Sequence, residues 1–129
     1  MLVAVPLFHS LGLKILSLPI LYAGGTIVLH RRFDAARVWQ AIEAERITYT
    51  GGVPTQYERL LAELETGDAG GASRASLRFL FTAGAAIGAD TVRAYERHGL
   101  RRGQGCGQTE PSILCCLDAR RALRPAGGG

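Results

Sequence analysis

Residues 104–110, which read Gln-Gly-Cys-Gly-Gln-Thr-Glu, combine glycines and side chains that suit the binding of a phosphate. Gly105 and Gly107 allow the backbone to approach a flat or charged ligand closely. The Thr109 hydroxyl and nearby backbone amides can donate hydrogen bonds to a phosphate oxygen. A carboxylate such as Glu110 repels a phosphate, so this pair indicates a metal ion between them. The alternative is a tight glycine turn between two strands, and the spacing alone favours that turn.

The better-known phosphate-binding motifs do not fit this segment. A dinucleotide-binding fingerprint would require a third glycine where Gln108 or Thr109 stands, followed by a helix, whereas Pro111 follows here. A Walker phosphate loop is excluded because the sequence contains no Gly-Lys-Ser or Gly-Lys-Thr. Spacing alone therefore does not identify the ligand.

Several other side chains could take part in chemistry, and each has a simpler alternative. His9 could gate a pocket or polarise a carbonyl group, or it could be a partly buried histidine that hydrogen-bonds to the backbone. Cys106 could be a nucleophile, but no histidine is near it in the sequence, and such a thiol is more often inert. Lys14, the single lysine, is expected to reach solvent rather than to act in catalysis. Ser10 lies in no Gly-x-Ser-x-Gly motif, which argues against a serine hydrolase.

The composition indicates one globular domain, or a piece of one, within 129 residues. Apolar residues make up 47% and charged residues 20%, which argues against a disordered chain. The net charge of +4 comes from arginine pairs with acidic residues between them, so no basic stripe suited to a nucleic acid is present in the sequence.

The cysteines and the apolar N-terminal region indicate in which cell compartment the protein acts and whether it spans a membrane. Cys106, Cys115 and Cys116 form no Cys-x-x-Cys pair, and this odd count indicates reduced thiols and a cytoplasmic protein. Residues 11–29 are long enough to span a membrane, but they contain Pro19 and a Gly-Gly pair. A helix, a turn and a buried strand explain them better, so we expect no transmembrane segment.

Short apolar runs alternate with helical patterns along the chain. The expected strands are residues 2–5, 26–29, 47–50, 77–81, 100–104 and 113–117. The expected helices are residues 11–22, 35–46 and 90–98, with a further helix that starts at Thr55. Asp34 is placed to cap the second helix and Gly99 to end the last one, while residues 67–73 form a glycine-rich loop. The alternation predicts an α/β fold with a partial, mostly parallel sheet and helices on both faces.

In such a fold, ligands bind at the carboxyl ends of the strands. Residues 6–9, 51–55, 82–86 and 104–110 all follow expected strands, so the sheet would bring them to one edge. Together with residues 23–26 and 33–34, this ordered series resembles the adenylate-forming (AMP-binding) superfamily. The closest resemblance is to the acyl-CoA synthetases, also called fatty-acid–CoA ligases. It extends from about residue 3 to residue 127 and corresponds to the middle of a longer protein.

The resemblance implies a two-step reaction that uses ATP, Mg²⁺ and coenzyme A. A small-molecule carboxylic acid attacks the α-phosphate of ATP, pyrophosphate leaves, and the thiol of coenzyme A then attacks the acyl-adenylate. By the family pattern, Thr109 and Glu110 would be catalytic, with Glu110 as the Mg²⁺ ligand. The nucleotide would contact Gly84, Ala85, Gln104, Gly105, Cys106 and Thr109. The acyl group would contact His9, Leu11, Ala83 and Gly107.

The sequence also departs from this family. Cys106 stands where an aromatic ring usually stacks on adenine, a loss of about 1 kcal/mol, and Ala86 replaces a usual proline. By the resemblance, the phosphate loop would precede residue 1 and the lysine-bearing domain would follow residue 129. Residues 1–129 would then be one incomplete AMP-binding segment, inactive alone and prone to associate through exposed strand edges. The alternative is a non-catalytic α/β module that binds an adenine nucleotide or a partner protein.

Overall fold

The computed structural model describes residues 1–66, 73–110 and 112–118, which form a six-stranded sheet with helices packed against it. The strands are β1 (Leu2–Val3), β2 (Val28–Leu29), β3 (Tyr49–Gly52), β4 (Phe79–Thr82), β5 (Arg102–Gln108) and β6 (Ser112–Asp118). The helices are η1 (Leu11–Ser17), α1 (Leu18–Tyr22), α2 (Ala35–Ala44), α3 (Pro54–Thr66) and α4 (Ala89–Arg97).

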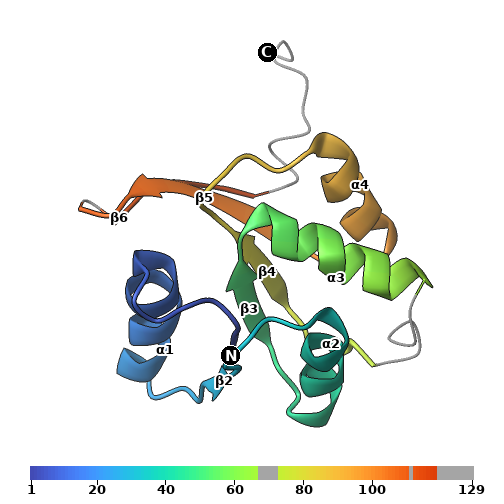
Figure 1. The fold of residues 1–129 in the computed structure, drawn as a ribbon, viewed down its shortest axis with the longest axis horizontal. Coiled ribbons are helices and arrows are strands. Elements are labelled where there is room, and N and C mark those ends of the chain that lie inside the picture. The colour runs from blue at the N-terminus through green and yellow to red at the C-terminus, as the bar shows by residue number, and fades with distance from the viewer. Residues whose placement is uncertain (67–72, 111, 119–129) are drawn as a thin grey trace.

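The strand order is β2-β1-β3-β4-β5-β6, and every neighbouring pair is parallel except the antiparallel pair β5–β6 (Figure 1). This arrangement confirms the predicted α/β fold with a mostly parallel sheet. Most of the predicted loop at residues 67–73 lies outside the described residues.

Side chains alternate between the two faces of the sheet and build a core on each. Leu2 and Leu80 point to the face covered by α2, α3 and α4, where Trp39, Ile42 and Tyr57 complete the core. On the other face Val3, Leu16 and Phe81 pack together under η1. Helices therefore cover both faces, as predicted, and η1–α1 lies apart from the other three helices (Figure 1).

Several strands begin and end later than the sequence predicts. Gly51 and Gly52 belong to β3 rather than ending it. A Cβ on Gly51 would lie only 2.5 Å from Cδ2 of Leu16, so the missing side chain lets η1 approach the sheet. The glycine run in residues 103–107 lies within β5, which makes the tight-turn interpretation wrong. The turn falls instead at Thr109 and Glu110.

The predicted cap at Asp34 and the predicted helix end at Gly99 are confirmed, whereas α2 ends at Ala44 rather than at Arg46. The Asp34 carboxylate accepts a hydrogen bond from the backbone N–H of Arg37 at 2.9 Å and caps α2. Gly99, just after α4, has φ +71°, a conformation that costs glycine little. The predicted helix at 11–22 is α-helical only from Leu18 on, because η1 is a π-helix in which the Ser17 hydroxyl donates to the carbonyl of Gly12 at 2.6 Å.

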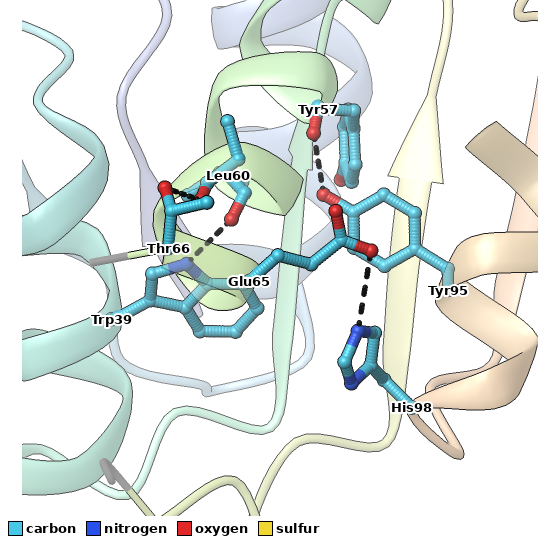
Figure 2. Close-up of polar contacts among 8 residues, drawn as sticks. Trp39, Tyr57, Leu60, Glu65, Thr66, Tyr95 and His98 are labelled. Carbon is cyan, nitrogen blue, oxygen red and sulfur yellow. Dashed lines mark hydrogen bonds and ion pairs between the residues drawn. The ribbon is translucent and has the colours of Figure 1, made fainter. Parts of the chain in front are cut away.

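Buried hydrogen bonds join α3 to the neighbouring helices α2 and α4 (Figure 2). The Trp39 indole N–H donates to the carbonyl of Leu60 at 3.0 Å, which joins α2 to α3. The Tyr95 hydroxyl donates to the carbonyl of Tyr57 at 2.6 Å, and the Tyr57 hydroxyl donates to that of Phe81 at 3.0 Å. Burial raises the pKa of both phenols, so they stay protonated as donors. Trp39 and Tyr57 are thus core residues.

Arg102, at the start of β5, is a buried cation with incomplete hydrogen bonding. Its side chain is 3% exposed, and its guanidinium carbon lies 6.0 Å and 5.9 Å from the ring centres of Tyr57 and Tyr95. Within the described part of the chain, Nε and Nη1 find no acceptor, and burial lowers the pKa of the group. The two rings therefore supply its electrostatic stabilisation.

We expect Arg102→Met to raise the free energy of unfolding by about 1–3 kcal/mol, because an apolar side chain removes a buried charge with unsatisfied donors. Urea unfolding followed by circular dichroism measures the change. Arg97→Met on the exposed side of α4 is the control and should leave stability within about 0.5 kcal/mol. A destabilised Arg102→Met protein would show that the ring contacts outweigh the cost of burial.

Candidate functional site

A cavity of about 160 Å³ lies between η1 and the segments that end β4 and form β5. It is lined by His9, Ser10, Leu11, Ile15, Ala83, Gly84, Gly105, Cys106, Gly107 and Thr109. Most of the predicted site residues are therefore brought together, although they come from parts of the chain up to a hundred residues apart. Ala85, Gln104 and Glu110 do not line it.

The segment after β4 forms one wall of this cavity. The Ala83 N–H donates to the carbonyl of Gly52 at 3.1 Å, which extends the β3–β4 pairing to the cavity edge. Gly84 then turns the chain with φ +93°, which a larger residue would adopt only with strain. The side-chain amide of Gln104 donates to the carbonyl of Ala85 at 3.2 Å. This bond ties the predicted nucleotide-binding residues of the two segments to one another.

The glycines of β5 allow close packing behind the cavity. A Cβ on Gly105 would collide with the ring of Phe81, whose side chain is buried in the sheet core. Only a residue without a side chain lets β5 pass over that ring. Cys106, on the same strand, is exposed and lines the cavity.

The third wall comes from η1 and the residues before it, and part of this wall was not predicted from the sequence. Ser10 and Ile15 line the cavity beside His9 and Leu11. The spacing of Leu11 and Ile15, four residues apart in a predicted helix, was the available signal. His9 is exposed, so its interpretation as a partly buried histidine is wrong.

Lys14 reaches from η1 to the turn between β5 and β6. Its ammonium Nζ donates to the carbonyl of Thr109 at 2.9 Å while the side chain stays exposed. The prediction that Lys14 reaches solvent is confirmed, and the structure adds this contact with Thr109. This contact places a positive charge next to the Thr109–Glu110 turn and ties that turn to the helix.

The acidic group of the site is Glu110, which is exposed in that turn. Among the described residues, no three His, Cys, Asp or Glu side chains are grouped as a metal ion would need. A site with one carboxylate suits Mg²⁺ that takes its other ligands from phosphate oxygens and water. In the part of the chain that the structure describes, no helix combines the length and apolar character needed to cross a bilayer.

The fold and this cavity define an adenylate-forming domain: a mostly parallel sheet with a glycine-lined pocket beside a Thr-Glu turn. The chain belongs to the AMP-binding enzyme family, whose profile matches residues 1–128.

Two curated relatives of the chain are enzymes that join an acid to coenzyme A. The chain is 43% identical over 115 residues to a feruloyl-CoA synthase of an Amycolatopsis species, covering 88% of this chain and 23% of that protein. It is 37% identical over 130 residues to an indoleacetate–CoA ligase of Aromatoleum aromaticum, covering 98% and 25%. The chain thus spans about a quarter of the length of these relatives.

A similar solved structure is the o-succinylbenzoate coenzyme A synthetase of Bacillus subtilis in complex with ATP and a magnesium ion. The two share 28% identity with a TM-score of 0.80, over 95% of this chain and 24% of the other.

Proposed function

We propose that this chain is a segment of an ATP-dependent ligase that joins a carboxylic acid to coenzyme A through an acyl-adenylate. The carboxylate displaces pyrophosphate from the α-phosphate of ATP, and the thiol of coenzyme A then displaces AMP. The observation that carries the proposal is the cavity itself, because η1, β4 and β5 meet there with the residues that the family pattern assigns. The relatives support the acid–CoA ligase class.

The nucleotide is proposed to lie against Gly84, Ala85, Gln104, Gly105, Cys106 and Thr109. The hydrogen bond between Gln104 and Ala85 holds the two walls of this region in a fixed relation. The acyl group is proposed to lie against His9, Leu11, Ala83 and Gly107, all of which line the cavity. Leu11 and Ala83 give this part an apolar surface that suits an aliphatic or aromatic acid.

When bound, ATP would supply the electrophilic α-phosphorus, and Mg²⁺ would neutralise part of the phosphate charge. The protein groups at the β5–β6 turn would hold the phosphates and the metal ion. The Thr109 hydroxyl is a donor for a phosphate oxygen, and Glu110 is an anionic oxygen ligand for Mg²⁺. Lys14 adds a cation to the same turn. Charge stabilisation of this kind is commonly the largest part of catalysis.

We also propose that residues 1–129 are one incomplete segment of a longer AMP-binding domain that acts in the cytoplasm. The isolated chain is then expected to bind nucleotide without turnover. The test is incubation with ATP, Mg²⁺, hydroxylamine and either a fatty acid or ferulate. We expect ATP–Mg²⁺ binding by calorimetry and no hydroxamate above background. Hydroxamate formation would overturn the inactivity, and absence of both binding and turnover would overturn the assignment of the site.

A second candidate, a non-catalytic module that binds a partner protein, is favoured by one observation. Leu18, Leu21 and Tyr22 on α1 expose 48%, 55% and 96% of their surface. Apolar side chains grouped in this way favour a protein contact. Self-association that masks α1, without nucleotide binding, would support this candidate.

We expect Glu110→Gln to weaken ATP binding about tenfold when Mg²⁺ is present and to leave it unchanged in EDTA, because the amide is a poorer ligand for a hard cation. Isothermal titration with and without the metal measures the difference. Glu58→Gln, an exposed carboxylate on α3, is the matched control. An equal loss of ATP affinity in EDTA would show that Glu110 is not a ligand of Mg²⁺.

We expect Lys14→Met to weaken ATP–Mg²⁺ binding by about threefold to tenfold without changing stability, because it removes one charged donor from an exposed turn. Amide chemical shifts of Thr109 and Glu110 should change with it. Lys14→Arg retains a cationic donor and should restore most of the affinity. Unchanged shifts at the turn would show that the contact does not hold it in place.

A further inference from the structure

Two cysteines lie directly opposite each other in the antiparallel pair β5–β6, at one end of the sheet (Figure 1). The backbone register pairs Cys106 of β5 with Cys115 of β6. Residues in this relation share one face of a sheet, and their Cα atoms are about 4.5–5.5 Å apart. A disulfide spans Cα separations of about 4.4–6.8 Å. The backbone therefore brings these two cysteines within the range of a disulfide.

The third cysteine of the sequence has a different place in the register. Cys116 pairs with Gly105 rather than with another cysteine. Successive residues of a strand alternate between the two faces of a sheet, so Cys116 belongs to the face opposite to that of Cys106 and Cys115. The Cα atoms of adjacent residues are about 3.8 Å apart, which is shorter than a disulfide ordinarily spans. The register thus favours the bond between Cys106 and Cys115 over the other two combinations.

The backbone around this pair can adjust to a new covalent bond. The register shifts between Cys106 and Gly107, so a β-bulge interrupts the ladder beside the pair. In the described part of the sheet, β6 is the last strand and pairs with β5 alone. An edge strand has backbone hydrogen bonds on one side only. A small shift of β6 would therefore disturb few of them.

Cys106 also lines the cavity of the candidate site. It is exposed there between Gly105 and Gly107, which line the same cavity and have no side chains. A dissolved reagent can therefore reach the Cys106 sulfur from solvent. A bond from Cys106 to β6 would fix its side chain and place a second sulfur atom beside it.

We propose that Cys106 and Cys115 form a reversible disulfide across β5 and β6, beside the cavity of the candidate site. The Cys106 thiolate attacks one sulfur of an external disulfide, oxidised glutathione, and one glutathione thiolate leaves. The Cys115 thiolate then attacks the Cys106 sulfur of this mixed disulfide, and the second glutathione thiolate leaves. The two departing thiolates take up, through solvent, the two protons that the cysteines release. Two cysteines are oxidised, and one oxidised glutathione is reduced to two glutathione molecules.

The bond itself does not depend on the proposed function, whereas its effect on nucleotide binding rests on that function. The nucleotide is proposed to lie against Cys106, so the added sulfur and the fixed side chain reduce the room for it. Disulfides in the cytoplasm are rare and are usually transient or redox-sensing. The reduced pair is then the resting form, and oxidised glutathione would switch the site to weaker nucleotide binding.

Mass spectrometry tests the bond on the 129-residue chain at low protein concentration. The chain is equilibrated with oxidised glutathione, and the remaining thiols are alkylated. We expect the chain to lose two hydrogen atoms, with Cys116 as the one alkylated cysteine and a link between Cys106 and Cys115 that dithiothreitol reverses. Cys116→Ser is the matched control and should form the same bond.

Cys115→Ser removes the second thiol of the pair. Because Cys116 belongs to the other face of the sheet, we expect a glutathione adduct to persist on Cys106 of this variant. In urea, where the register is lost, Cys106 of the unmodified chain should link to Cys115 and Cys116 about equally. The same lack of preference without urea would overturn the proposal. A persistent glutathione adduct on the unmodified chain, or a disulfide-linked dimer in place of the internal bond, would overturn it as well.

Calorimetry with ATP–Mg²⁺ before and after oxidation tests the effect on the site. Cys116→Ser is the sample, because it retains only the two cysteines of the pair. We expect at least about tenfold weaker binding when the bond is formed and full recovery in dithiothreitol. Equal affinities of the two forms would contradict the effect on the site. Absence of ATP binding by the reduced chain, with the Cys106–Cys115 bond still forming, would remove the proposed function and leave the disulfide in place.

Discussion

Trp39→Ala is expected to lower the free energy of unfolding by about 4 kcal/mol, the largest effect of any single substitution considered. The side chain is 0% exposed and packs between α2, α3 and the sheet. Truncation removes this apolar surface from the core, leaves a cavity, and deletes the hydrogen bond to the carbonyl of Leu60. A domain of ordinary stability would then retain only a small part of its free energy of unfolding. Urea unfolding monitored by far-ultraviolet circular dichroism measures the loss.

Two variants make this prediction specific. Trp39→Phe keeps an aromatic ring but not the indole N–H, so its loss should be smaller than that of alanine. Phe8→Ala removes a comparable ring that is 91% exposed and should change stability by less than about 0.5 kcal/mol. Equal losses for Phe8→Ala and Trp39→Ala would contradict the packing described for α2.

Gly12→Ala is expected to cost about 3 kcal/mol and to weaken ATP–Mg²⁺ binding. A Cβ at this position would collide with the carbonyl oxygen and carbon of Pro6. These are backbone atoms, so no side-chain rotation relieves the overlap and η1 must move away from the sheet. Because Leu11 and Ile15 lie on η1 and line the cavity, the displacement also alters the candidate site. Thermal unfolding and nucleotide calorimetry on the same sample report the two effects.

A matched substitution separates this collision from the general effect of alanine. Gly88 precedes α4 with φ −63°, and the nearest atom to an added Cβ is the Thr91 hydroxyl oxygen at 3.8 Å. Gly88→Ala should lose no more than about 1 kcal/mol, mainly through a weaker helix cap. A Gly12→Ala protein as stable as Gly88→Ala would show that η1 does not pack on Pro6 as described.

Local signals explain the part of the fold that the sequence predicts. The apolar runs, the Asp34 cap and Gly99 act within a few residues of their own positions. Gly51 was misassigned because its place in β3 depends on Leu16, which approaches from η1 at a distant point of the chain. Gly105 of β5 depends likewise on Phe81. Contacts between distant segments of this kind leave no periodic trace in the sequence.

The candidate site, like the fold, could be predicted from the sequence only in part. The ordered segments predicted one shared site, and the structure brings His9, Ala83 and Gly107 to one cavity, because parallel strands share a carboxyl edge. Lys14 was missed because its contact with Thr109 depends on how η1 lies against the β5–β6 turn. A π-helix orients its side chains differently from the α-helix that the sequence predicts.

The position of β1 has a consequence for how the chain folds during synthesis. β1 is synthesised before both of its neighbours, yet it lies inside the sheet, between β2 and β3, with Leu2 and Val3 at 1% and 0% exposure. Its neighbours pair at Val28 and Thr50, so this apolar segment must wait for about fifty residues of nascent chain before it is enclosed. During that interval it is a natural binding segment for a chaperone.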